Sequence, residues 1–135
     1  MPERPLPVPT PTTQPFWDAV QQHRLVLQFS PGTGQWVYYP RSHAPGTLAD
    51  DLEWREASGM GTVYTFTVAR RPTAPAWEGA SPQLIAVVEL DEGPKVTTEL
   101  VGIAPDAIRI GLRVRAVCDN SPDSDITLLR FAPAP

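Results

Sequence analysis

Side chains able to act as acids, bases or nucleophiles are few in this 135-residue chain and do not gather in one segment. The two histidines, His23 and His43, lie far in sequence from the single cysteine, Cys118, which is most simply a buried strand thiol. Two acidic pairs, at 50–51 and 91–92, could serve acid–base chemistry, but both fall in predicted turns, where carboxylates are more often solvated. No nucleophile, base and acid form a set, so the sequence predicts no catalytic residue.

Arginine is the residue type best suited to bind a ligand here, because its planar guanidinium presents paired donors to phosphate oxygens. Ten of the eleven basic residues are arginines, a bias that a GC-rich genome would also produce. The candidate ligand-binding residues are Arg41, Arg70, Arg71, Arg113 and Arg115. The last two fall on one face of a predicted strand, since alternate strand residues point the same way. An exposed strand face with solvated charges remains the alternative for this pair.

Composition and charge argue against several classes of function. The net charge of −4 and the pI of about 5.0 argue against a nucleic-acid binder, which gains most of its non-specific affinity by neutralising phosphates. Gly59-Met60-Gly61 precedes a strand with no following helix, so it lacks the context of a dinucleotide-binding loop. The apolar runs are too short to span a membrane, and Met1–Thr12 has no apolar stretch of signal-peptide length. We therefore expect a soluble, cytoplasmic protein with no membrane or nucleic-acid partner and no intramolecular disulfide.

The first residues of the chain alternate proline with other residues, and we expect 1–12 to form an extended, proline-rich tail. A short helix is predicted from Gln14 to Arg24, with Thr13 as its N-cap and Pro15 in its first turn. Its apolar stripe consists of Phe16, Trp17 and Val20. His23 would lie near the C-terminal end of this helix, where the helix dipole favours a charged imidazolium.

The rest of the chain has β-strand character interrupted by turns. Residues 25–57 contain extended segments at 25–29, 36–39 and 52–54, separated by turns that contain glycine and proline. Beyond Gly59, five strands are predicted at 61–68, 84–90, 95–101, 109–117 and 126–131, with a long loop at 70–82, a helical turn at 104–107 and a bend at Gly111. Five short strands with a helical turn between the third and the fourth are typical of an OB-fold barrel, in which closure removes exposed strand edges.

Taken together, these segments resemble the zinc-ribbon plus OB-fold proteins that accompany thiolases and other acyl-CoA enzymes. The resemblance covers about residues 11–133 and rests on the order and spacing of short matching stretches. These are Pro15-Phe16-Trp17, Leu25-Val26-Leu27-Gln28, Tyr39-Pro40-Arg41, Leu52-Glu53-Trp54, Ser58-Gly59-Met60-Gly61-Thr62-Val63-Tyr64, Val88-Glu89-Leu90-Asp91-Glu92-Gly93-Pro94, Ile110-Gly111-Leu112-Arg113-Val114 and Phe131-Ala132-Pro133-Ala134. The implied fold is mostly β, with an N-terminal helix and rubredoxin-like ribbon (residues 13–57) joined to a five-stranded OB-fold barrel (residues 58–135).

The resemblance also implies a zinc site whose ligands this sequence lacks. The family's ribbon normally carries two Cys-x-x-Cys pairs, and the corresponding positions here are Ser30, Thr33, Ala44 and Thr47. A structural zinc site needs four thiolate or imidazole ligands, and the neighbouring His43 offers only one. We therefore expect no zinc and no other resident cofactor. The aromatic residues between 29 and 54 are candidates for a substitute core, with drift in a dispensable ribbon as the alternative.

The function that the resemblance implies is that of a non-catalytic accessory subunit in an acyl-CoA-processing complex. Its partner would be a thiolase-type acyltransferase or a steroid side-chain aldolase, or a hydratase of lipid metabolism, within a hetero-oligomer. The side chains expected to contact that partner are Phe16, Trp17, Trp36, Tyr38, Tyr39 and Trp77. The candidate arginines would then share a contact with the phosphates of coenzyme A.

Two other functions stay open on the sequence alone. An OB-fold can bind single-stranded nucleic acid, although the acidic charge and the lack of a basic, aromatic stripe count against it. A self-sufficient acyl-CoA enzyme would depend on residues such as Arg70, Arg71 or His43 for turnover. The accessory subunit is favoured because loop aromatics and prolines are abundant and no catalytic set is recognisable.

Overall fold

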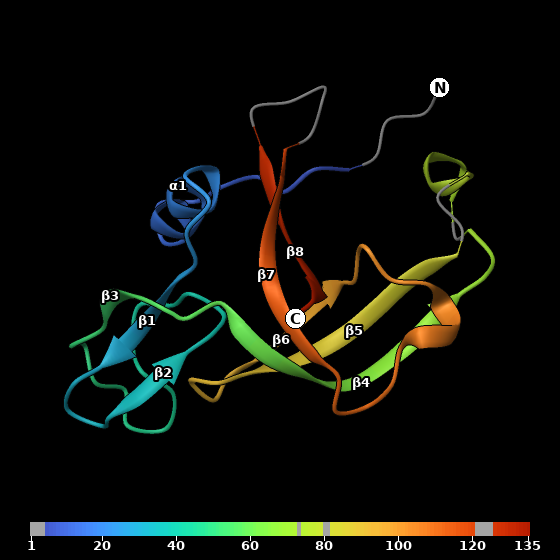
Figure 1. The fold of residues 1–135 in the computed structure, drawn as a ribbon. Helices are drawn as coiled ribbons and strands as arrows, with labels where there is room; N and C mark the ends of the chain where they lie inside the picture. Colours follow the sequence, from blue (N-terminus) through green and yellow to red (C-terminus); the bar gives the residue numbers. More distant parts are fainter. Residues whose placement is uncertain (1–4, 73, 80–81, 121–125) are drawn as a thin grey trace.

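The computed structural model describes residues 5–72, 74–79, 82–120 and 126–135. The fold is mostly β, as predicted, and consists of a small helix-and-ribbon unit beside a barrel (Figure 1). In the proline-rich segment, residues 5–10 have no regular secondary structure, and Pro7 and Pro9 are half-buried. None of the helices in the described ranges combines the length and the hydropathy that crossing a bilayer requires.

The single α-helix among the described residues, α1 (Gln14–Gln21), ends earlier than predicted. It ends because His23 adopts a left-handed conformation, with a φ of 61°. The N–H groups of His23 and of the next residue donate to the carbonyl oxygens of Val20 and Ala19, at 2.9 and 2.8 Å. This is the Schellman pattern, in which glycine is the usual left-handed residue. Thr13 occupies the predicted N-cap position, but its side chain makes no capping hydrogen bond.

The ribbon is a three-stranded antiparallel sheet. It contains β1 (Val26–Ser30), β2 (Gln35–Val37) and β3 (Glu53–Glu56), with β1 in the centre. Strand β2 ends at Val37, so Tyr38 and Tyr39, which the sequence predicts as strand, lie in the segment that follows it. That segment leads away from the sheet toward the helix.

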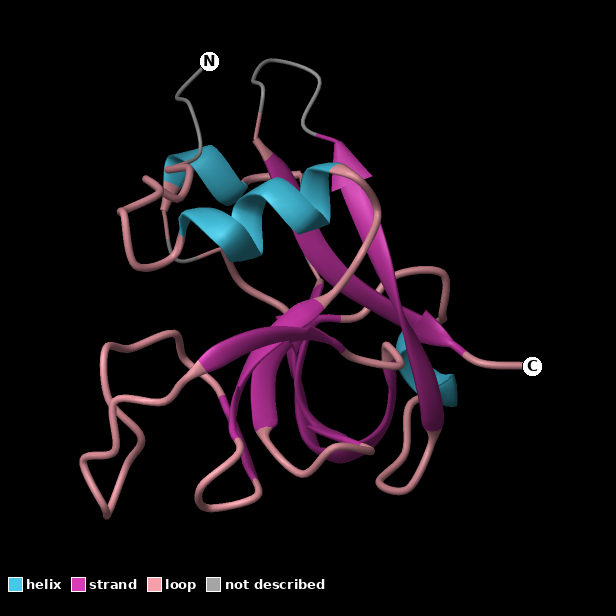
Figure 2. Ribbon diagram, turned by 90° about the vertical axis from the view of Figure 1, so that its left-hand side faces the viewer, coloured by secondary structure: helices cyan, strands magenta, loops and turns pink. Residues whose placement is uncertain are grey.

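The barrel is formed by five antiparallel strands in the order β6-β5-β4-β7-β8 (Figures 1 and 2). The strands are β4 (Met60–Ala69), β5 (Gln83–Leu90), β6 (Lys95–Glu99), β7 (Arg113–Asn120) and β8 (Thr127–Pro133). A parallel bridge between Leu100 and Phe131, with the Val101 N–H donating to the Phe131 carbonyl at 2.8 Å, joins the two outer strands. The 3-10 helix η2 (Pro105–Ala107) lies between β6 and β7, and η1 (Pro75–Trp77) lies in the long loop after β4. The OB-fold prediction is confirmed.

The fourth barrel strand begins at Arg113, later than the predicted Arg109, and runs on to Asn120. The reason is Gly111, which adopts a φ of +91° and closes a turn in front of the strand. Its N–H donates to the carbonyl of Val63 at 2.9 Å, which ties this turn to β4. Gly111 therefore provides the predicted bend, but the bend precedes the strand.

One apolar core extends through both parts of the molecule. Phe16 and Val20 of the helix and Leu27 of β1 belong to the same buried cluster as Val88 and Phe131 of the barrel. Four of these five side chains are at most 1% exposed, so the ribbon and the barrel are in direct apolar contact at this core. The barrel thus positions the ribbon directly through packed side chains.

Gly61 marks a close approach between β4 and β5. A Cβ atom at this position would lie 2.5 Å from Val88 Cγ1 and 2.8 Å from the Glu89 carbonyl oxygen. The second neighbour is backbone of the adjacent strand and cannot rotate away. Only glycine fits here without a displacement of β5.

We expect the Gly61→Ala variant to lower the free energy of unfolding by about 1–3 kcal/mol, because overpacking forces the neighbouring strand to move. Urea denaturation monitored by tryptophan fluorescence measures this change. Thr65→Ala, at an exposed position of the same strand, is the matched control and should cost less than about 1 kcal/mol. Equal denaturation midpoints for Gly61→Ala and the wild type would contradict the steric argument.

Candidate functional site

An aromatic groove lies where the helix, the ribbon and the barrel meet. It encloses about 250 Å³ and is lined by residues of α1, of the segment after β2, of β6 and β8, and by Pro7 of the proline-rich segment. Four of the six predicted partner-binding residues line it: Phe16, Trp17, Tyr38 and Tyr39. Its charged lining residue, Arg130, is paired with Glu99 at 3.6 Å, so the groove carries little net charge.

The aromatic rings of the groove pack against each other and differ strongly in exposure. The ring centroids of Phe16 and Trp17 lie 5.0 Å apart, edge to face, and those of Tyr38 and Tyr39 lie 4.3 Å apart. Such pairs stabilise their arrangement beyond simple burial. Phe16 is buried in the core, whereas Tyr39 is 56% exposed. Burial and, to a lesser extent, the neighbouring Tyr39 raise the pKa of Tyr38 to about 12, so its phenol stays protonated at physiological pH.

The other two predicted aromatics lie elsewhere. Trp36 packs edge to face on Phe29 within the ribbon, with ring centroids 5.3 Å apart. It also lines a second cavity of about 370 Å³ together with Glu92 and Pro94 of the β5–β6 turn. Trp77 belongs to η1, on the opposite side of the barrel from the ribbon (Figure 1). The structure therefore separates Trp77 from the groove.

The candidate arginines do not converge on one point. Arg41 is held by its backbone, which exchanges two hydrogen bonds of 2.8 Å with the buried side chain of Gln28, and its exposed guanidinium bonds to the Tyr39 carbonyl at 3.2 Å. Arg70 and Arg71 are exposed at the far end of β4. The remaining two, at 113 and 115, are exposed on the outward face of β7, as predicted from strand alternation.

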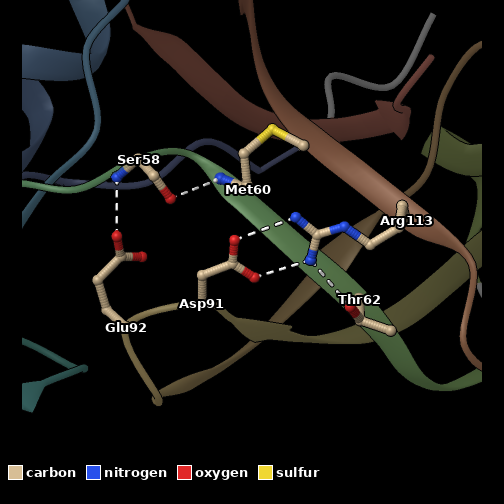
Figure 3. Close-up of polar contacts among 6 residues, drawn as sticks. All are labelled: Ser58, Met60, Thr62, Asp91, Glu92 and Arg113. Carbon is tan, nitrogen blue, oxygen red and sulfur yellow. Dashed lines mark hydrogen bonds and ion pairs between the residues drawn. The ribbon is translucent and has the colours of Figure 1, made fainter.

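The guanidinium of Arg113 is bound by other side chains of the same chain. It forms a bidentate pair with Asp91, at 2.8 and 3.0 Å, and donates to the Thr62 hydroxyl at 3.1 Å (Figure 3). The hydrogen bonds from Arg113 hold the pKa of the Asp91 carboxyl below its ordinary value. Planar fork-to-fork pairing of this kind fixes geometry as well as charge. Arg113 thus links β7 to the β5–β6 turn.

The neighbouring acidic residue also has a structural contact that the sequence analysis missed. Glu92 Oε2 accepts the Ser58 N–H at 2.9 Å, and the Ser58 hydroxyl accepts the Met60 N–H at 3.1 Å (Figure 3). The pair at 91–92 lies in the predicted turn, and both carboxylates have partners within the chain: Asp91 binds Arg113 of β7, and Glu92 binds the backbone just before β4. The partners are distant in sequence, so local pattern gives no signal for them.

The four positions at which the family's ribbon carries zinc ligands do not fit a metal. Ser30 and Ala44 are completely buried, and neither side chain is a thiolate or an imidazole. Across the described ranges, no three histidine, cysteine, aspartate or glutamate side chains group to hold a metal ion. Cys118 lies in β7, half-buried, and burial raises the pKa of its thiol.

Comparison with known proteins places this architecture in a family. Residues 54–119 match the family model for the C-terminal OB-fold domain of ChsH2. A solved structure titled Ltp2-ChsH2(DUF35) aldolase contains a chain that is 36% identical, with a TM-score of 0.83. The likeness covers 96% of this chain and 100% of that one. The chain belongs to the DUF35 family.

Two longer relatives carry names of acyl-CoA enzymes. A probable enoyl-CoA hydratase alpha subunit of Thermomonospora curvata is 41% identical over 121 residues, which are 88% of this chain and 37% of that protein. The 3-oxo-4,17-pregnadiene-20-carboxyl-CoA hydratase alpha subunit of Mycobacterium tuberculosis is 34% identical over 108 residues, which are 80% of this chain and 34% of that protein. The DUF35 chain therefore matches about a third of the length of each hydratase subunit.

The Asp91–Arg113 contact can be tested by titration. In the Arg113→Gln variant we expect the pKa of Asp91 to rise toward the ordinary value of an aspartate, as measured by NMR of the side-chain carboxyl. Arg115→Gln, on the same face of β7, is the control and should leave this pKa unchanged. Because the folded-state pKa is lowered, the contact stabilises the fold above the unfolded pKa and is lost as pH falls through the folded pKa. An unchanged pKa in Arg113→Gln would refute the assignment.

Proposed function

We propose that this DUF35 protein is a non-catalytic accessory subunit of an acyl-CoA-processing enzyme complex. The observation that carries the proposal is the match to a chain in a structure titled Ltp2-ChsH2(DUF35) aldolase, which covers 96% of this chain and 100% of that one. The names of the two longer relatives, both alpha subunits of CoA-ester hydratases, agree with it. In the proposal, the partner is an aldolase or hydratase subunit of lipid or steroid side-chain metabolism. A thiolase-type acyltransferase is the other partner that we consider.

The ribbon offers the surface for this partner. Tyr39 at the edge of the aromatic groove is 56% exposed, and Leu48 in the second ribbon turn is 75% exposed. Leu48 also has a φ of +57°, a left-handed conformation that costs a residue with a side chain about 1–2 kcal/mol. Burial of a large, exposed apolar side chain against another protein is favourable in free energy, and a strained backbone at such a residue is typical of a functional position. In the proposal, these two residues anchor the partner.

The proposal includes a contact with coenzyme A that is shared with the partner. Arg113 is bound to Asp91, which leaves its neighbour Arg115 as the better candidate on the outward face of β7. Arg41, Arg70 and Arg71 are exposed residues at other edges of the fold. A guanidinium on a phosphate raises affinity without touching the reacting acyl group. A change of this contact therefore affects binding more than turnover.

Partner binding is tested by co-expressing the chain with the aldolase, hydratase or thiolase subunit encoded beside it and purifying through a tag on that subunit. We expect co-elution, and at least a tenfold weaker Kd for a Tyr39→Ala, Leu48→Ala double variant in calorimetry, because apolar contact area is removed. Ile110→Ala, which truncates a 68% exposed side chain on the barrel, should bind normally. If the wild-type chain elutes alone and leaves the enzyme's activity unchanged, the proposed function is wrong.

The coenzyme A contact is tested in the assembled complex by steady-state kinetics. The Arg115→Ala variant should raise KM for the acyl-CoA about tenfold and leave kcat nearly unchanged, since a charge-assisted hydrogen bond to a phosphate is lost. Arg109→Ala, which removes an exposed arginine in the turn before β7, serves as the control. An unchanged KM in Arg115→Ala would show that Arg115 does not bind coenzyme A, and it would not contradict the proposed accessory role.

A further inference from the structure

The ribbon has two turns that a metal would hold together in a zinc ribbon, and here a carboxylate reaches between them. Asp51 follows the second turn, and its side chain points to the first. Its Oδ1 accepts the Ser30 hydroxyl at 2.7 Å, and its Oδ2 accepts the Gly32 N–H at 2.7 Å. Both bonds are short, as expected when the acceptor is an ionised carboxylate.

The first turn is organised around this carboxylate. Ser30, at the first of the four ligand positions, is completely buried, and its Oγ also lies 3.4 Å from the Thr33 N–H. The Ser30 carbonyl accepts the Gly34 N–H at 2.7 Å. A Cβ atom on Gly32 would lie 2.7 Å from Asp51 Oδ2, so the carboxylate occupies the space that a side chain would need. The turn and the carboxylate are thus fitted to each other.

The second turn is held by hydrogen bonds between its own residues, and Asp51 follows it at a position next to the first turn. Ala44, at the third ligand position, is completely buried, and its N–H donates to the Ala49 carbonyl at 2.8 Å. Its carbonyl accepts the Leu48 N–H at 2.9 Å. The Thr47 hydroxyl, at the fourth position, accepts the Ala49 N–H at 3.4 Å. Backbone hydrogen bonds therefore fix this turn without a ligand shared between the two turns.

We propose that Asp51 does in this ribbon what zinc does in ribbons with four cysteines: its carboxylate cross-links the two turns and holds the second turn, which carries Leu48, against the first. We call this contact the Asp51 clasp. It makes the ribbon independent of metal. It also makes the ribbon sensitive to acid, because protonation of the carboxylate removes an acceptor.

The direction of the acid effect follows from the groups around the clasp. The Ser30 hydrogen bond and then the Gly32 N–H hold the pKa of Asp51 below its ordinary value, against the opposing effect of desolvation. Residues 30–35 carry no ionisable side chain. The ionisable residues on the second turn and β3 are His43, Asp50, Glu53, Arg55 and Glu56, of which Arg55 pairs with Glu53 and Glu56 pairs with Arg24. A lowered folded-state pKa means that the clasp stabilises the ribbon above about pH 4, and that this stability is lost as pH falls through the folded pKa.

Hydrogen exchange of the full-length chain tests the clasp residue by residue. In Asp51→Ala we expect the N–H groups of Gly32 and Gly34 to exchange at least tenfold faster, while N–H groups of the barrel strand β5 keep their protection. Asp50→Asn, which neutralises the adjacent carboxylate, is the matched control and should exchange like the wild type. Wild-type protection of Gly32 and Gly34 in Asp51→Ala would overturn the proposal.

A second measurement needs no variant and separates the clasp from a metal. In the wild type, protection of the two ribbon glycines should survive EDTA and fall at acidic pH before that of the barrel. Elemental analysis should find no stoichiometric zinc. Stoichiometric zinc together with loss of ribbon protection in EDTA would refute the clasp. Neither result bears on whether the chain binds an enzyme subunit, so the proposed function is tested independently.

Discussion

The apolar core that passes from the helix and β1 into the barrel is the constraint on which the other features depend. Val20, Leu27, Val88 and Phe131 are each at most 1% exposed, although they come from both parts of the molecule. Each fully buried side chain of this size contributes about 1.5–3 kcal/mol. A ribbon that shares such a core does not have to be stable by itself. It differs in this respect from finger peptides, which lack such a core and gain about 10–16 kcal/mol from zinc.

In the proposal, aromatic packing and the Asp51 clasp together stabilise the ribbon in the way that a metal would. Trp36, Tyr38 and Trp54 pack, partly buried, against the shared core, as expected for a substitute core. The guanidinium of Arg55 lies 4.0 Å above the ring of Phe29, which extends this packing to the outer face of the sheet. Packing of this kind is non-directional, however, and does not fix the two turns. Directional hydrogen bonds to a carboxylate supply the missing specificity.

The sequence predicts the barrel well because β-strand alternation and turn residues are local signals. It misplaces the end of α1, because His23 takes the left-handed position that usually reveals itself as a glycine. It fails for Asp51 and Glu92, whose partners Ser30 and Ser58 are 21 and 34 residues away. These contacts exist only after the strands have paired, and the register that aligns Phe29 with Glu53 brings the first turn near Asp51. Residue type alone selects the four aromatic side chains that line the groove, but it predicts neither the groove itself nor which ring is exposed, because both depend on the tertiary packing.

Two acidic side chains, Asp51 and Glu92, act as structural acceptors rather than as solvated surface charges. Asp51 binds a hydroxyl and an N–H inside the ribbon, and Glu92 binds an N–H at the junction with the barrel. Glu92 also lines the cavity that Trp36 borders, so the β5–β6 turn and β2 face each other across it. One carboxylate therefore holds the first ribbon turn, and the other holds the β5–β6 turn that faces β2 across this cavity. The exposed Tyr39 is positioned by other contacts, because the backbone of Arg41, two residues further on, is held by two hydrogen bonds of 2.8 Å to the buried Gln28 side chain of β1.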